Sequence, residues 1–154
     1  MISNERQYTN TLRLLAEFTG HLEELRARYA DNAILLDLST GQFVRHIEEF
    51  EQDIAEYEAA RAGDLAPVMP CYDSQSGRLE IGRALTRLRL AKGLTQEQVA
   101  KLVGTHQPSI TRWENPDYEA YRLADLRKLA NALGRDLDVV FVERAPPEPG
   151  SEAS

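Results

Sequence analysis

The chain has 154 residues, of which 42% are hydrophobic and 28% charged, and its formal net charge at pH 7 is −7. No apolar stretch approaches the roughly 20 residues of a membrane-spanning helix, and no secretory leader is visible. We therefore expect a soluble, cytoplasmic protein with no membrane partner. The single cysteine, Cys71, excludes an intrachain disulfide and a zinc finger, which predicts a free thiol.

The charge is unevenly divided along the chain. Residues 1–70 contain six basic and thirteen acidic residues, whereas residues 80–144 contain eleven basic and nine acidic ones. The negative charge therefore belongs to the first half. Two halves of such different charge are expected to meet different partners.

Residues 1–61 carry apolar residues at helical spacing in two runs, separated by a break at residues 31–41. The first run is Tyr8, Leu15, Phe18, Leu22, Leu25 and Tyr29, and the second is Phe43, Ile47, Phe50, Ile54 and Tyr57. The pattern predicts an antiparallel helical hairpin. Two helices alone bury too little apolar surface for independent stability, so we expect the hairpin to dimerise or to bind a partner. Its acidic face is either solvated or a docking surface for a basic protein.

Residues 62–78 lack sustained periodicity and are rich in glycine, proline and serine. This composition predicts a linker, and Cys71 lies within it.

A short helix is predicted from Thr95 to Gly104. Thr95 and Gln98 have the spacing of a capping box at a helix start, and Gly104 stands where a left-handed helix end favours glycine. Between them lie apolar residues at helical spacing and one small residue at a close helix crossing: Val99, Leu102 and Val103, with Ala100.

A second short helix is predicted from Gln107 to Trp113. Pro108 is tolerated in a first helical turn, and Ile110 and Trp113 lie three residues apart on the side expected to be buried. The remaining residues face outward: Ser109, Thr111 and Arg112.

The flanking segments complete a small helical domain at residues 79–144. Apolar faces are formed before Gly93 by Ile81, Leu85 and Leu88, and before Gly134 by Leu123, Leu126, Leu129, Ala130 and Leu133. Four or five helices would close one core, so the fold is mainly all-α. The run from Leu137 to Val142 predicts a short strand that needs a partner, and residues 145–154 are too polar and proline-rich to fold.

The segment from Leu79 to Val142 resembles the Cro- and lambda-repressor-like helix-turn-helix regulators, the Xre family. The positions that carry the resemblance are Val99, Ala100, Gly104, Ile110 and Trp113. The resemblance implies that the second helix enters the major groove of double-stranded DNA. It further implies that Gln96 contacts a phosphate and braces Gln107, which would read adenine.

The resemblance identifies eight candidate DNA-binding residues: Thr95, Gln96, His106, Gln107, Pro108, Ser109, Thr111 and Arg112. Pro108 offers only an apolar contact, and His106 either touches a phosphate or has no role. Arg112 either pairs with guanine or phosphate, or instead pairs with Glu114 or Asp117 and serves stability alone. Phosphate contacts are expected from Arg83, Arg87, Arg89, Lys92, Lys101, Arg112, Arg122, Arg127 and Lys128.

No enzymatic motif is present. The chain has no phosphate-cradling glycine loop, and His21, His46 and His106 lack metal-ligand spacing, so neither a cofactor nor a metal is expected. His46 near Glu49 indicates a surface ion pair.

These patterns lead to the hypothesis of a sequence-specific, dimeric DNA-binding regulator of transcription, a repressor that occupies a palindromic operator and acts on its own promoter. One alternative is an antitoxin that binds a toxin protein and autoregulates its operon. Another is a protein-interaction module that has lost DNA binding, which the net charge of −7 would favour.

Overall fold

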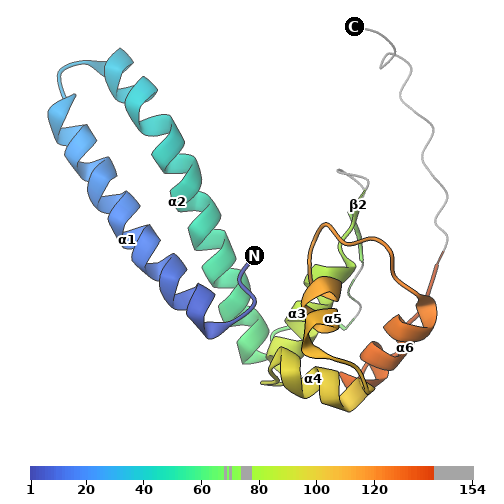
Figure 1. Ribbon diagram of the computed structural model, residues 1–154. Helices are drawn as coiled ribbons and strands as arrows, with labels where there is room; N and C mark the ends of the chain where they lie inside the picture. Colours follow the sequence, from blue (N-terminus) through green and yellow to red (C-terminus); the bar gives the residue numbers. More distant parts are fainter. Residues whose placement is uncertain (68, 70, 74–77, 141–154) are drawn as a thin grey trace, which may run out of the picture.

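The computed structural model describes residues 1–67, 69, 71–73 and 78–140. It contains a long helical hairpin beside a smaller bundle of short helices (Figure 1). The elements are α1 (Glu5–Arg28), α2 (Ala33–Ala62), β1 (Tyr72–Asp73), β2 (Arg78–Leu79), α3 (Ile81–Ala91), α4 (Gln96–Val103), α5 (Gln107–Trp113) and α6 (Leu123–Ala132). The predicted fold class, mainly all-α with an amino-terminal helical hairpin, is confirmed.

Helices α1 and α2 form the predicted antiparallel hairpin, but the break expected at residues 31–41 is wrong, because α2 already begins at Ala33. The side chains of Asn4 and Asn32 cap the two helix starts by accepting hydrogen bonds from backbone N–H groups three residues on. Phe18 packs between the helices, with ring centroids 5.5 Å from Phe43 and 5.4 Å from Phe50. The apolar stripes read from the sequence therefore face each other. Within the described residues, none of the helices combines the length and apolarity needed to cross a bilayer.

Helices α3 to α6 enclose a second apolar core. Its buried members are Leu85, Val99, Ala100, Ile110, Leu126, Leu129 and Leu133, with Trp113 packed against them as a partly buried neighbour. Two expected core positions are wrong, and one of them is Leu123, which is 62% exposed at the first residue of α6. Leu102 is 60% exposed, because the inward side of α4 is occupied by Val99, Ala100 and Val103.

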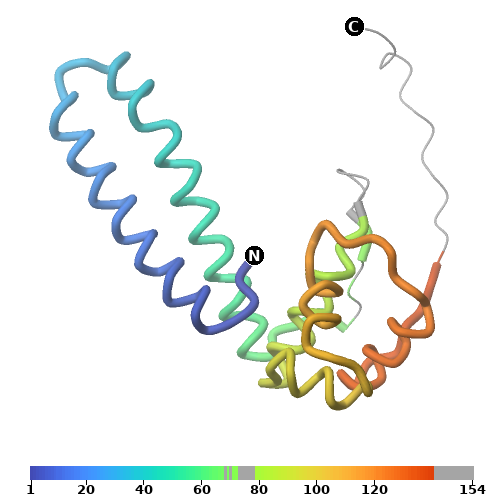
Figure 2. The backbone as a smooth tube through the Cα atoms, in the orientation of Figure 1, coloured from blue at the N-terminus to red at the C-terminus, as the bar shows by residue number. Residues whose placement is uncertain are grey.

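The hairpin and the bundle are joined at the end of α2 and at α3. A separate apolar cluster there contains Ile2, Ile54, Tyr57, Ala60 and, from α3, Leu90. Figure 2 shows the amino-terminal segment lying beside the last turns of α2, at this junction. The amino-terminal helices therefore gain stabilising burial from α3 as well as from each other, which sequence periodicity did not reveal.

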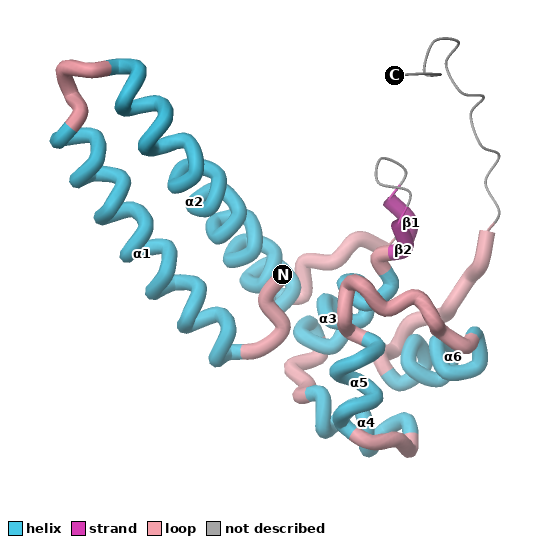
Figure 3. The backbone as a smooth tube through the Cα atoms, turned by 45° about the horizontal axis from the view of Figure 1, so that its top comes forward, coloured by secondary structure: helices cyan, strands magenta, loops and turns pink. Residues whose placement is uncertain are grey.

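The predicted linker contains regular structure. Strand β1 pairs with β2 in antiparallel register, Tyr72 opposite Leu79 (Figure 3). The predicted terminal strand is wrong in its described part, since residues 137–140 have no regular secondary structure. A strand needs a neighbouring strand for its backbone hydrogen bonds, and within the described residues none lies against this segment. Residues 141–144 and the predicted tail at 145–154 lie outside the described residues.

Candidate nucleic-acid interface

Helix α4 is delimited by the residues that the sequence singled out. The Thr95 hydroxyl accepts a hydrogen bond from the Gln98 backbone N–H at 3.2 Å, and the Gln98 side chain accepts one from the Thr95 N–H at 2.7 Å. This is the predicted capping box. The helix ends at Gly104, whose φ of 72° is left-handed and favours a residue without a Cβ.

Helix α5 begins directly after this turn and presents one side to solvent. Pro108 stands in its first turn, and Ile110 is buried in the core at 1% exposure. The exposed side chains on and next to the helix are His106, Gln107, Pro108, Thr111 and Arg112, while Ser109 is half-buried. The structure thus leaves the face expected to meet DNA uncovered.

A hydrogen-bonded cluster connects α4 to this exposed face. The Gln107 amide nitrogen lies 3.2 Å from the Gln96 side-chain oxygen, and the Thr111 hydroxyl donates to the same oxygen at 2.9 Å. Gln107 also lies 3.3 Å from the Thr111 hydroxyl. The contact between Gln96 and Gln107 that the resemblance implied is therefore present in the structure.

A buried carboxylate holds the other end of the Gln96 side chain. The Gln96 amide nitrogen donates to Glu114 at 2.9 Å, and Glu114 also receives two hydrogen bonds from the Arg89 guanidinium. The carboxylate thereby fixes which way the Gln96 amide points, because only its nitrogen can donate.

Arg89 was expected to contact phosphate, and the structure contradicts this. Its side chain is 3% exposed and donates to Glu114, to the Leu94 carbonyl at 2.9 Å and to the Ser3 carbonyl at 2.8 Å. A cation enclosed in this way cannot reach a phosphate. Sequence reasoning missed the pair because 25 residues separate its partners, and the only available signal was an arginine at a position on the inward face of α3.

For Arg112, the alternative of a pair with Glu114 is not the one found, because Glu114 is occupied by Arg89 and Gln96. The Arg112 guanidinium instead lies over the Tyr118 ring, 5.5 Å from its centroid. A cation held over an aromatic ring at the surface keeps its outer N–H groups accessible.

Other expected phosphate cations are partly engaged within the protein. Arg83 binds Glu56 of α2 with a shortest distance of 2.7 Å, and Arg87 lies 3.7 Å from the same carboxylate. Lys101 pairs with Glu97 at the surface, which lowers the pKa of the Glu97 carboxyl through a hydrogen bond and the lysine charge. The expected cations that remain exposed are Lys92, Lys101, Arg112, Arg122, Arg127 and Lys128.

Tyr121 braces the carboxyl end of α5. Its hydroxyl donates to the Trp113 carbonyl at 2.6 Å, which satisfies a backbone acceptor that the helix end leaves open. Burial raises the pKa of Tyr121 to about 12, so the hydroxyl stays protonated and continues to donate in alkaline solution, where an exposed tyrosine would ionise.

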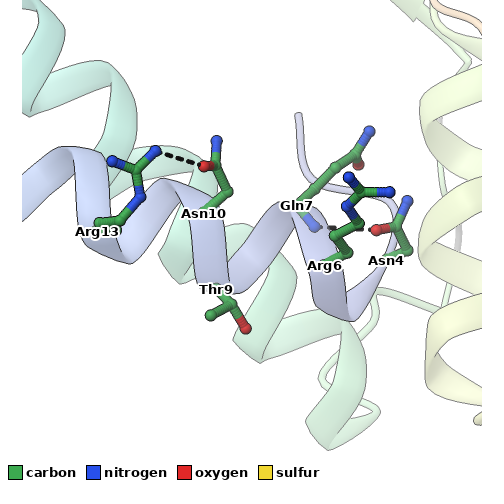
Figure 4. A pocket seen from close by; sticks show the side chains of 6 residues that line it. All are labelled: Asn4, Arg6, Gln7, Thr9, Asn10 and Arg13. Atoms are coloured by element: carbon green, nitrogen blue, oxygen red, sulfur yellow. Dashed lines mark hydrogen bonds between the residues drawn. The ribbon is translucent and has the colours of Figure 1, made fainter.

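A shallow depression lies along the first turns of α1 (Figure 4). Its lining consists of exposed side chains that point along the helix face: Asn4, Arg6, Gln7, Thr9, Asn10 and Arg13. Arg13 donates to Asn10 within the lining at 2.9 Å. Nothing in the chemistry of this depression indicates a catalytic role.

Comparisons with known proteins agree with this geometry. Residues 80–140 match the family model described as "Helix-turn-helix domain". A protein of Mycobacterium tuberculosis named "Putative antitoxin HigA2" is 42% identical over 55 residues, which is 36% of this chain. The chain spans about half the length of that relative, 54% of it. No solved structure matches.

The chain therefore carries a helix-turn-helix domain over residues 80–140, where the sequence predicted a helix-turn-helix motif.

Proposed function

We propose that the protein is a sequence-specific DNA-binding regulator of transcription whose helix α5 enters the major groove. The observation that carries the proposal is the exposed face of α5, on which Gln107 is held by Gln96 and Thr111. The major groove admits a helix and displays a different donor and acceptor pattern for each base pair. The Gln107 amide suits adenine, with which it forms two hydrogen bonds once one of its N–H groups leaves the Thr111 hydroxyl.

The remaining expected contacts divide by chemistry. Arg112, exposed beside Tyr118, can reach guanine or phosphate, while Pro108 offers an apolar surface to a thymine methyl group. Contacts with the sugar-phosphate backbone of DNA suit the remaining polar side chains. These are Thr95, Gln96, His106, Ser109 and Thr111. Exposed lysines and arginines of the domain supply the charge that binds phosphates.

The test is a salt-titrated binding assay on the duplex upstream of the gene, with Gln107→Ala and Arg112→Ala. Removing Gln107 should weaken binding by about 1–3 kcal/mol and relax the preference for one base pair, with no change in salt slope. If Arg112 contacts phosphate, its removal should reduce that slope by about 1. Gln52→Ala and Arg28→Ala, which alter exposed residues of the hairpin, are the matched controls.

Binding unchanged by both α5 substitutions would argue against the proposal. Absence of any salt-dependent affinity for duplex DNA would favour an interaction module that has lost DNA binding.

We further propose that the protein acts as a dimer and represses by occupancy. The far end of the hairpin exposes three apolar side chains at the start of α2: Ile34, Leu35 and Leu38. Pairing of this surface between two copies would give a two-fold symmetric regulator, suited to a palindromic operator with half-sites about 34 Å apart. Light scattering on the full chain and on Ile34→Asp/Leu38→Asp checks this, since the double variant should be monomeric.

A second candidate function is that of an antitoxin. The 42% identity with a protein named as an antitoxin favours it. The acidic residues of α2, including Glu48, Glu49 and Glu51, would suit a basic partner. Co-expression with the product of the neighbouring gene tests the idea. Relief of growth inhibition and co-purification of the two proteins would support it, and a neighbouring product that is not toxic would count against it.

A further inference from the structure

The segment before α1 is anchored on the helix-turn-helix domain. The Ser3 carbonyl accepts a hydrogen bond from the Arg89 guanidinium at 2.8 Å, although 86 residues separate the two in sequence. The neighbouring Ile2 is 3% exposed and packs with Tyr57 of α2 and Leu90 of α3. Figures 1 and 3 show the amino terminus at this junction. We call Ile2 and Ser3 the amino-terminal anchor.

The anchor is connected to the exposed face of α5 by consecutive hydrogen bonds. Arg89 donates to Ser3 and to Glu114, Glu114 accepts from Gln96 at 2.9 Å, and Gln96 accepts from Gln107 at 3.2 Å. The path is continuous, and its inner members are buried. We call this path the anchor relay.

The Arg89 side chain is oriented by three acceptors of different origin. They are the Glu114 carboxylate, the Leu94 carbonyl and the Ser3 carbonyl. The Arg89 Nε donates to Glu114, Nη1 donates to the Leu94 carbonyl, and Nη2 donates both to the Ser3 carbonyl and to Glu114. Removing the Ser3 carbonyl would leave a buried guanidinium N–H without its acceptor, which is costly in a site that excludes water. The fork would then rotate toward other acceptors and carry the Glu114 carboxylate with it.

We propose that the amino-terminal anchor is a positioning element for base reading. By holding Arg89, it fixes Glu114, which orients the Gln96 amide and so restricts the rotamers of Gln107. A pre-ordered Gln107 loses less conformational freedom on binding a base, so affinity for the correct sequence rises while phosphate contacts are untouched. The inference rests on the proposed function and adds a means of regulating the same site, because a partner that shifts the hairpin against α3 would release the anchor.

The test compares Ile2→Asp with Leu12→Asp in the full chain. Both replace an apolar side chain by a carboxylate, but Leu12 is an exposed residue of α1, whereas Ile2 is the buried residue of the anchor. The probes are a duplex selected by the wild-type protein from a random library and an unrelated duplex of equal length. Ile2→Asp should weaken binding to the selected duplex about tenfold and to the unrelated duplex by less than about twofold, at an unchanged salt slope. Ile2→Val should restore wild-type behaviour.

A readout without DNA separates this inference from the proposed function. In nitrogen-15 spectra, the side-chain amide signals of Gln96 and Gln107 should shift in Ile2→Asp and stay in place in Leu12→Asp. If the signals shift but the wild-type protein shows no sequence preference, the proposed function fails, and the claim that the anchor tunes base reading fails with it, while the relay itself stands.

Two results would overturn the inference alone. The first is that the wild-type protein prefers the selected duplex, that Ile2→Asp shows the same preference, and that the glutamine signals do not shift in this variant. The second is equal loss of both duplexes in Ile2→Asp with a lowered melting temperature, because the anchor would then serve folding only.

Discussion

Arg89 and Glu114 form an ion pair with two hydrogen bonds, and both side chains are almost completely buried. The pair joins the last turn of α3 to the end of α5, and it therefore helps to set the distance between α3 and the exposed face of α5. Replacing a buried pair by apolar residues is often tolerated, whereas removing one partner leaves an uncompensated charge.

Glu114→Gln should therefore destabilise the fold by about 3 kcal/mol, measured by urea unfolding. The amide keeps the shape of the carboxylate but leaves the buried Arg89 charge without a counter-ion. The matched control is Glu97→Gln, because Glu97 pairs with Lys101 at the surface and its loss should change stability little.

The double variant Arg89→Met/Glu114→Leu should lose less stability than the sum of the two single changes, since it removes both charges together. Additive losses would show that the two side chains act independently, contrary to the geometry.

The local features of the interface could be predicted from sequence because their causes are local. The hydrogen bonds of the Thr95 cap join residues three apart, and glycine at position 104 is favoured by the left-handed backbone conformation of that residue. The periodicity of Ile110 and Trp113 likewise determined which side of α5 turns inward. The Gln96 to Gln107 contact came from the family resemblance.

The errors concern relationships between distant parts of the chain. A count of cations cannot distinguish Arg89, buried against Glu114, from an arginine at the surface. The docking of Ile2 on Leu90 has no sequence period to reveal it. The expected strand, which is absent from the described residues 137–140, rested on β-branched composition, and such residues form a strand only where a neighbouring strand is available.

Gly82 of α3 lies where a side chain would strike backbone. A Cβ added there would lie 2.8 Å from the Asn115 carbonyl oxygen and 2.9 Å from the Glu114 carbonyl oxygen. Gly82→Ala should therefore destabilise the protein by about 1–3 kcal/mol through overpacking. Gly20→Ala in α1, where a Cβ meets nothing within 4 Å, should stabilise it by up to about 1 kcal/mol through helix propensity. Thermal unfolding of both variants checks the contrast, and equal effects of the same sign would contradict it.

Cys71 should react slowly with thiol reagents in the folded protein. Burial, together with the nearby Glu80 charge, raises the pKa of the Cys71 thiol, so less reactive thiolate is present near neutral pH. Labelling by an aromatic disulfide at pH 7 should be slower than in urea-unfolded protein, and Glu80→Gln should speed it modestly. A folded-state rate equal to the unfolded rate would show that the thiol is neither shielded nor shifted.

Tyr121 should make stability fall at alkaline pH. Its pKa is raised to about 12 in the folded protein from an ordinary value of 10.0, chiefly by burial. The unfolded chain therefore releases this proton first, and between pH 10 and about 12 the folded state binds more protons than the unfolded state. The contribution of Tyr121 to the free energy of unfolding is therefore complete below pH 10 and is lost progressively as the pH rises toward 12.

Tyr121→Phe should flatten that decrease, and at neutral pH it should cost about 1 kcal/mol through loss of the hydrogen bond to Trp113. Urea unfolding at a series of pH values from neutral to 11 measures both effects. Tyr8 and Tyr57, whose pKa values are also raised, should leave a residual slope in the variant. Tyr8→Phe is the matched control because it removes a hydroxyl bound to Glu58 on the hairpin and leaves the brace at α5 in place. Identical alkaline slopes in the wild type and in Tyr121→Phe would show that the Tyr121 hydroxyl is not held as the structure places it.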